Sequence, residues 1–113
     1  MESREFKPFG SVSALTLGGG GIGNVWGETS KEESIASVHL ALESGIDHLD
    51  VAPMYGKGEA ERVVGEAIKE RSRDSFRLTT KCALGSMPDE EVYDRFNTSS
   101  VSYTHLTLPT TPY

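Results

Sequence analysis

Three polar side chains that could together deliver a proton lie in or beside two short apolar segments. Asp50 ends one such segment, Tyr55 follows in the next loop, and Lys81 lies near the end of the second segment. An ammonium group close to a tyrosine favours the ionised phenol and so makes it a better proton donor, while a carboxylate holds the lysine charged and oriented. Taken singly, each residue also has an ordinary structural explanation, so the hypothesis depends on the fold bringing all three together.

Two helices are expected between the segments that carry these residues. Ser30 and Glu33 form a capping box, in which each side chain satisfies a free backbone N–H, and Gly45 is suited to end the helix in a left-handed cap. The apolar face of this helix carries Ile35, Val38, Ala41 and Leu42. A second helix is expected over 59–71, with an apolar stripe of Ala60, Val63, Val64, Ala67 and Ile68.

Short apolar runs bounded by turns predict buried strands at 46–51 and 76–83, and 88–96 is expected to start a third helix. Residues 5–9 and 14–17 fit a hairpin or a strand that enters a sheet. The alternation of strands and helices predicts an α/β protein with parallel strands, whose carboxyl ends gather at one rim. Neighbouring strands are about 4.8 Å apart, so the three polar side chains can meet there. An open doubly wound sheet and a (β/α) barrel both fit the pattern.

A glycine-rich segment follows the first strand. Gly18, Gly20 and Gly23 have the G-x-G-x-x-G spacing of a dinucleotide-binding loop, but that loop requires a helix to begin at once and the capping signal comes only at Ser30. A tight strand exit where side chains would clash is therefore favoured, and it stays compatible with a backbone that approaches a ligand closely. Trp26, in the loop beyond, could line a pocket or fasten the loop to the core.

The composition excludes several classes of function. A length of 113 residues suits one small domain, and a net charge of -6 argues against binding to nucleic acid. No run approaches the ~20 apolar residues that span a membrane. The single cysteine, Cys82, cannot form an internal disulfide, which fits a cytoplasmic protein. His39 and His48 are interpreted as structural or solvated residues, and no metal site is expected.

The composition changes abruptly near Ser100. Residues 101–113 contain no Asp, Glu, Lys or Arg, and Val101 to Thr110 can be written in codons that read as a transposase adapter used to prepare sequencing libraries. A β-prone, disordered extension is the alternative interpretation. We expect 98–113 to be a translated adapter, a non-native tail, and 1–97 to be the N-terminal portion of the natural protein. The natural protein would then continue beyond Asn97.

The run GIDHLDVAPMYG at 45–56 resembles the aldo-keto reductase superfamily. The family pattern falls on Gly45, Asp50, Ala52, Tyr55, Gly56, Glu61 and Gly65. The run TTKC at 79–82 is similar to the family's strand ending in its catalytic lysine, and 17–23 with Trp26 is similar to the first strand and substrate loop of bacterial, short-loop members. The resemblance covers about 14–96.

The resemblance implies a fold and an activity. The fold would be a (β/α)8 TIM barrel, with about three of its eight strands present and the first hairpin closing its bottom. The activity would be reversible hydride transfer between NADP(H), or in some members NAD(H), and an aldehyde, a ketone or a sugar lactol. The family's catalytic histidine and its phosphate-binding residues would lie beyond the end of the matching segment.

The resemblance also implies roles for individual residues. Tyr55 would be the general acid that protonates the carbonyl oxygen, Lys81 would make Tyr55 a stronger acid, and Asp50 would pair with Lys81 and lie near the nicotinamide ribose. Two glycines, Gly19 and Gly20, would lie near the nicotinamide. The indole of Trp26 would line the substrate pocket.

Two other functions stay open. One is a regulatory or redox-sensing barrel subunit that binds nucleotide without turnover, and the other is an unrelated doubly wound domain that uses the glycine loop. The presence of Asp50, Tyr55 and Lys81 together favours the enzyme, since a binding module does not need all three. A barrel sheet that stops after three strands has exposed edges and an incomplete core. We therefore expect the 113-residue polypeptide on its own neither to fold stably nor to turn over substrate.

Overall fold

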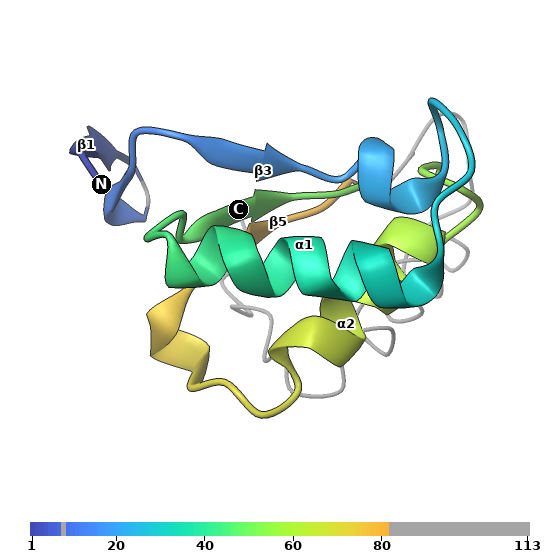
Figure 1. Cartoon of the computed structure of the whole chain (residues 1–113). Helices are drawn as coiled ribbons and strands as arrows, with labels where there is room; N and C mark the ends of the chain where they lie inside the picture. Colours follow the sequence, from blue (N-terminus) through green and yellow to red (C-terminus); the bar gives the residue numbers. More distant parts are fainter. Residues whose placement is uncertain (8, 82–113) are drawn as a thin grey trace, which may run out of the picture.

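The computed structural model describes residues 1–7 and 9–81, which form a hairpin, a parallel sheet and two helices (Figure 1). The elements are β1 (Ser3–Phe6), β2 (Gly10–Ser13), β3 (Thr16–Gly18), the 3-10 turn η1 (Gly21–Gly23), α1 (Lys31–Glu43), β4 (His48–Asp50), α2 (Glu59–Ile68), the 3-10 turn η2 (Arg73–Ser75) and β5 (Arg77–Thr79). The helix expected at 88–96, Cys82 and the tail at 98–113 lie outside the described residues.

The three parallel strands lie in the order β3-β4-β5, as alternating strands and helices predict. Leu17, Leu49 and Leu78 are aligned across the sheet and belong to the apolar core beneath α1 and α2. Because successive side chains of a strand point to opposite faces, His48 and Asp50 lie on the face of β4 away from that core. The alternation therefore puts leucines toward the helices and polar side chains on the other face.

Helix α1 begins as the capping box predicts. The Ser30 hydroxyl accepts a hydrogen bond from the Glu33 backbone N–H at 3.1 Å, and the Glu33 carboxylate accepts one from the Ser30 N–H at 3.2 Å. The helix ends at Glu43, and Gly45 has φ +89°, the left-handed conformation expected of it. Of its predicted apolar face, Val38 and Ala41 are buried, while Ile35 and Leu42 pack at the border of the core.

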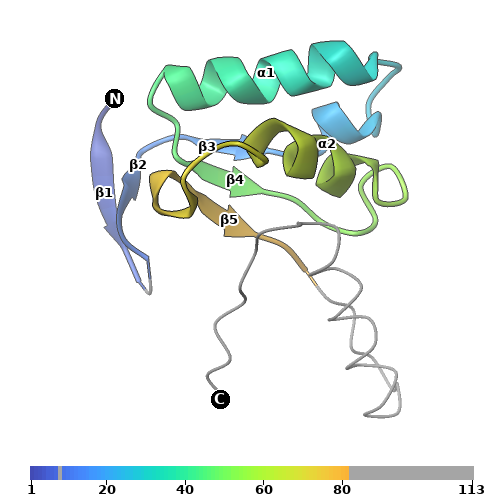
Figure 2. The ribbon, with the colours of Figure 1, turned by 90° about the horizontal axis from the view of Figure 1, so that it is seen from below.

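Helix α2 buries its entire predicted stripe. Ala60, Val63, Val64, Ala67 and Ile68 are all buried. The helix ends at Ile68, before the expected end at residue 71, and the chain reaches β5 through η2. Phe76, just before β5, is fully buried in the same core. The two helices pack against each other and cover one face of the sheet, where Leu49 of the middle strand is fully buried and Leu17 and Leu78 of the outer strands are half-buried (Figure 2).

The N-terminal hairpin differs in its boundaries from the expected one. Strand β1 pairs antiparallel with β2, and Ala14 N still donates to the Glu2 carbonyl at 2.7 Å. Thr16 and Leu17 belong to β3 of the parallel sheet, which confirms the alternative of a strand that enters a sheet. The hairpin lies beside the ends at which the parallel strands begin (Figure 2). Two reciprocal hydrogen bonds fasten it there, from Ser13 N to Asp47 Oδ1 at 2.7 Å and from Asp47 N to Ser13 Oγ at 3.0 Å. Within the described ranges, neither helix is both long enough and apolar enough to cross a membrane.

Candidate active site

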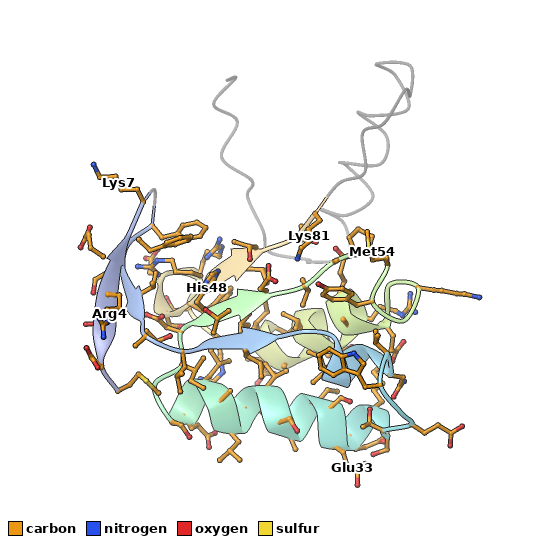
Figure 3. All side chains as sticks on the ribbon, turned by 90° about the horizontal axis from the view of Figure 1, so that it is seen from above. Arg4, Lys7, Glu33, His48, Met54 and Lys81 are labelled. Carbon is orange, nitrogen blue, oxygen red and sulfur yellow. The ribbon has the colours of Figure 1, made fainter. Side chains whose placement is uncertain are left out.

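Lys81 and Asp50 meet at the carboxyl ends of β5 and β4. The Lys81 Nζ atom lies 3.1 Å from each carboxylate oxygen of Asp50 and also donates to the backbone carbonyl of Val51 at 2.9 Å. The two side chains stay 44% and 37% exposed, so a molecule at the rim can reach them. Figure 3 shows Lys81 and Met54 at the end toward which the strands run. The predicted meeting of Asp50 and Lys81 at one rim is present.

A threonine completes the surroundings of Asp50. The Thr79 hydroxyl donates a hydrogen bond to Asp50 Oδ1 at 2.6 Å. Partial burial raises the pKa of Asp50, but the hydrogen bonds from Thr79 and Lys81, with the charge of Lys81 and that of His48 when its ring is protonated, outweigh it and lower the pKa below its ordinary value. Asp50 is therefore an anion over the physiological range and holds the ammonium group of Lys81 in a fixed direction.

Tyr55 lies beside the same lysine. The Lys81 Nζ atom is 5.2 Å from the centroid of the half-buried Tyr55 ring, which is the range of a cation–π contact. The structure records no hydrogen bond between the Tyr55 hydroxyl and Lys81 within residues 1–7 and 9–81. All three predicted residues are thus brought together, with the lysine against the face of the ring.

Two glycines fix the backbone around Tyr55. A Cβ atom on Gly23 would lie 2.8 Å from the Tyr55 carbonyl oxygen, and a Cβ atom on Gly56 would overlap the Gly23 carbonyl oxygen. The loop after β3 and the loop after β4 therefore cross at van der Waals distance, which only hydrogen side chains allow. The Tyr55 carbonyl also accepts a hydrogen bond from Ala60 N at 3.2 Å, at the first turn of α2. Tyr55 is held between the glycine loop and α2.

The glycine cluster is a crowded strand exit rather than a dinucleotide-binding loop of the G-x-G-x-x-G type. It leads into the 3-10 turn η1, and α1 begins only at Lys31. Gly19 is buried against β4: its N–H donates to the Asp50 carbonyl at 2.7 Å, and a Cβ atom would lie 2.7 Å from the Val51 side chain. Gly20 is buried beneath an indole, because its Cβ atom would lie 2.9 Å from Trp26. The favoured interpretation of the segment is confirmed.

Trp26 covers this loop and stays open to solvent. Its ring packs over Gly20 and Gly21, yet the residue is 82% exposed. Val25 and Met54 are also exposed apolar residues, the first beside Trp26 and the second beside Tyr55 in the chain. Trp26 therefore packs on the glycines of its own loop, and its place in a substrate pocket stays a prediction.

Sequence reasoning missed two supporting contacts. His48 is buried, which agrees with the structural interpretation, but its position within hydrogen-bond distance of Thr79 was not expected. Glu61, buried in α2, accepts a hydrogen bond from the Thr80 hydroxyl at 2.7 Å and so fastens the residue before Lys81. The alternation of side chains along β4 could have placed His48 on the face of Asp50. Nothing in the sequence indicates which threonine each would meet.

The arrangement offers an anion, a cation and a phenol at one rim, which suits the donation of a proton to an oxygen that gains negative charge. Among the residues that the structure describes, no group of three or more His, Cys, Asp or Glu side chains could hold a metal ion. The Trp26 indole and the Asp50 carboxylate both keep surface open to solvent. Gly18 leaves free space nearby, since a Cβ atom there would meet nothing within 4 Å.

Solved structures of aldo-keto reductases share the fold of this chain. A thermostable aldo-keto reductase, Tm1743, solved with the inhibitor epalrestat, superposes with a TM-score of 0.78 at 24% identity, over 99% of this chain and 45% of that one. An aldo-keto reductase from Klebsiella pneumoniae, solved with NADPH, has a TM-score of 0.78 at 24% identity over 91% of this chain and 35% of that one. The predicted fold class, α/β with the arrangement of the first part of a (β/α)8 barrel, is confirmed.

Sequence comparison gives the family. The chain is 46% identical over 75 residues to the aldo-keto reductase YhdN of Bacillus subtilis, covering 65% of this chain and 23% of that protein. It is 32% identical over 81 residues to D-threo-aldose 1-dehydrogenase of a Pseudomonas species, covering 72% of this chain and 25% of that protein. The chain thus spans about a quarter of the length of these relatives. The model of the aldo/keto reductase family matches residues 14–107, and the chain belongs to that family.

Proposed function

We propose that the protein to which this chain belongs is a nicotinamide-dependent oxidoreductase that interconverts an aldehyde, ketone or sugar lactol with its reduced or oxidised partner. The observation that carries the proposal is the joint placement of Asp50, Lys81 and Tyr55 at one rim. One relative is named for the oxidation of an aldose, and one structural neighbour was solved with NADPH, which supports the substrate class and the cofactor. NADP(H) is the proposed cofactor, with NAD(H) as the alternative.

Each residue has a proposed role. Tyr55 is the general acid toward the carbonyl oxygen in reduction and the base toward the alcohol in oxidation. Lys81, beside the Tyr55 ring, stabilises the negative charge that develops as the phenol gives up its proton. Asp50 keeps Lys81 charged and directed, because it binds the ammonium group through both carboxylate oxygens. The proton therefore moves at the Tyr55 hydroxyl, and the ion pair sets how readily it moves.

The cofactor would be held in part by the residues of this rim. The bound nicotinamide dinucleotide would supply or accept the hydride. Asp50 offers its exposed carboxylate edge, which can accept a hydrogen bond from a ribose hydroxyl. Gly19 and Gly20 keep the strand exit narrow, and Trp26 offers an apolar surface to substrate. A small-molecule substrate, no nucleic acid and a cytoplasmic location complete the proposal.

We propose further that 98–113 is a translated adapter and that the natural protein continues the barrel beyond Asn97. Amplifying the gene from its source DNA and sequencing past the codon for Asn97 tests this. A reading frame that continues into further strand and helix patterns supports the proposal. A genomic frame that encodes VSYTHLTLPTTPY followed by a stop codon would refute it, and the enzymatic proposal would fall with it.

The catalytic proposal is tested in the complete protein with NADPH and a panel of aldehydes, ketones and aldoses. Tyr55→Phe keeps the ring against which Lys81 packs and removes only the hydroxyl, so structure and nucleotide binding should be retained. Turnover should fall by about 10²–10⁴-fold, the usual contribution of a general acid. Turnover that survives the change would exclude Tyr55 as the acid. A wild-type protein that binds NADPH but turns over nothing would instead support the regulatory subunit.

A further inference from the structure

A row of polar side chains crosses the sheet beneath the ion pair of Asp50 and Lys81. His48 lies at the centre of this row, on the middle strand, and is 8% exposed. Its Nδ1 atom is 3.0 Å from the hydroxyl of Thr16 on β3, and its Nε2 atom is 3.3 Å from the hydroxyl of Thr79 on β5. Figure 3 shows His48 on β4, nearer the hairpin than Lys81 is. The imidazole thus joins all three parallel strands.

The hydrogen atoms of this row can be assigned by counting donors. An ionised carboxylate only accepts, so the 2.6 Å contact between Thr79 and Asp50 requires the single hydroxyl hydrogen of Thr79. The Thr79 oxygen can then only accept from His48, so His48 Nε2 must carry a hydrogen. In the neutral ring Nδ1 is left to accept from the Thr16 hydroxyl. Donation therefore runs in one direction, from Thr16 through His48 and Thr79 to Asp50.

We propose that His48 is a positioning residue of the proton-donating site, which acts by holding the Thr79 hydroxyl in the orientation that binds Asp50. The role rests on the proposed function, since it concerns the ion pair that sets Tyr55. Thr79 has another possible acceptor, the Leu49 carbonyl at 3.5 Å. The hydrogen bond from His48 Nε2 fixes the Thr79 oxygen on the side of Asp50, and Asp50 in turn directs Lys81.

The surroundings of His48 favour a fixed ring. The rings of Phe6 and Phe9 each lie with their centroids 5.8 Å from that of the imidazole. A phenyl ring would fill such a place at lower cost, because a buried polar group is unfavourable unless it is hydrogen-bonded. Both ring nitrogens of His48 have partners, so the cost is offset by the contacts that define the row.

The first test does not depend on turnover. In the complete protein with ¹⁵N-labelled histidine rings, NMR should show the Nε2–H tautomer for the neutral His48, assigned by the loss of its signals in His48→Gln. In ¹³C carboxyl titrations, the pKa of Asp50 should rise in Thr79→Val and in His48→Phe. An Nδ1–H tautomer, or an Asp50 titration that neither change moves, would overturn the proposal. Thr79→Ser, which keeps the hydroxyl, is the matched control for Thr79→Val.

The second test separates positioning from packing. His48→Phe should lower kcat by up to about tenfold, the upper range for one hydrogen bond between neutral groups, with KM changed less than about twofold. His48→Gln, whose amide can still donate to Thr79, should recover most of the loss. Thr79→Val should match His48→Phe, and the double variant should be no worse than either, because both act on one contact. Losses that multiply in the double variant would contradict the proposal.

The outcomes distinguish this inference from the proposed function. A complete protein that shows the Nε2–H tautomer and the shifted Asp50 titration but no turnover would refute the proposed enzymatic function and support the proposed contacts of His48. An active enzyme whose His48 carries its hydrogen on Nδ1, or whose double variant shows additive losses, would support the enzymatic function and refute the role of His48. Should His48→Phe fail to fold, Thr79→Val against its control Thr79→Ser gives the kinetic and Asp50 titration comparison, and the tautomer of His48 is measured in the unsubstituted protein.

Discussion

Replacing Gly56 by alanine tests whether the crossing of two loops holds Tyr55 in place. Gly56 has φ +64°, a left-handed conformation, and a Cβ atom there would overlap the Gly23 carbonyl oxygen and lie 3.0 Å from the Glu59 Cβ atom. The added Cβ atom would meet backbone on one side and the start of α2 on the other, so the clash cannot be relieved by the rotation of a flexible side chain. The variant must move one loop or the other.

The magnitude follows from two separate costs. A residue with a Cβ atom in the left-handed conformation destabilises the folded protein by about 1–2 kcal/mol relative to glycine. The overlap with Gly23 requires a backbone shift, and overpacking of this kind costs about 1–3 kcal/mol more. We therefore expect Gly56→Ala to lower the free energy of unfolding of the complete protein by about 2–5 kcal/mol and its melting temperature by roughly 3–7 °C. If Tyr55 moves by about 1 Å, turnover falls on the order of 10²-fold.

Two glycines in the chain separate these costs in thermal unfolding experiments on the complete protein. Gly10 has φ +75° but open space around its Cβ position, so Gly10→Ala should show the conformational cost alone. Gly18 has open space and no positive φ, so Gly18→Ala should change stability by less than about 0.5 kcal/mol. Gly56→Ala should therefore destabilise the protein most, Gly10→Ala less and Gly18→Ala least. A Gly56→Ala protein as stable as Gly10→Ala, with unchanged turnover, would refute the reasoning.

Three further predictions concern the core, a helix start and the ion pair. Leu49→Ala should lower the free energy of unfolding by about 2–5 kcal/mol in urea titrations, since Leu49 is fully buried, whereas Leu40→Ala, at a 66% exposed position, should stay within about 0.5 kcal/mol. Ser30→Ala should cost about 1 kcal/mol in the same titrations through loss of the N-cap, and Ser30→Asp should restore it. The pKa of Asp50 lies below 3.8 in the folded protein, so its contribution to stability is complete above that pH and is lost as the pH falls through the folded pKa. Lys81→Met should raise that pKa in ¹³C carboxyl titrations, and an unmoved titration would show that the ion pair does not control it.

Local patterns predicted the elements well because their causes are local. The capping box at Ser30 and the stripe of α2 depend on residues within one or two turns of each other, and both are present as expected. Residues 14–17 left a hairpin and a strand that enters a sheet both open, because the choice depends on β4, a partner distant in sequence. The early end of α2 is the ordinary uncertainty of a helix terminus.

The site was predictable to the extent that topology alone positions it. Asp50 and Lys81 follow neighbouring parallel strands, and such strands end at one rim, so their pairing could be expected. The crossing of Gly23 with Gly56, and the contact of His48 with Thr79, join segments far apart in sequence. Such contacts depend on how the loops and strands are packed in three dimensions, and no spacing in the sequence encodes them.

The order of the parallel strands has a consequence for how the chain is made. Strands β3, β4 and β5 lie side by side in the order in which a ribosome releases them. Each new strand can therefore dock on the one completed just before, while the helix between them closes over the leucine face. Chains fold from the N-terminus during synthesis at about 5–20 residues per second, so roughly a few seconds separate one docking step from the next. Translation and assembly then run in the same direction, and each new segment finds its partner strand already in place.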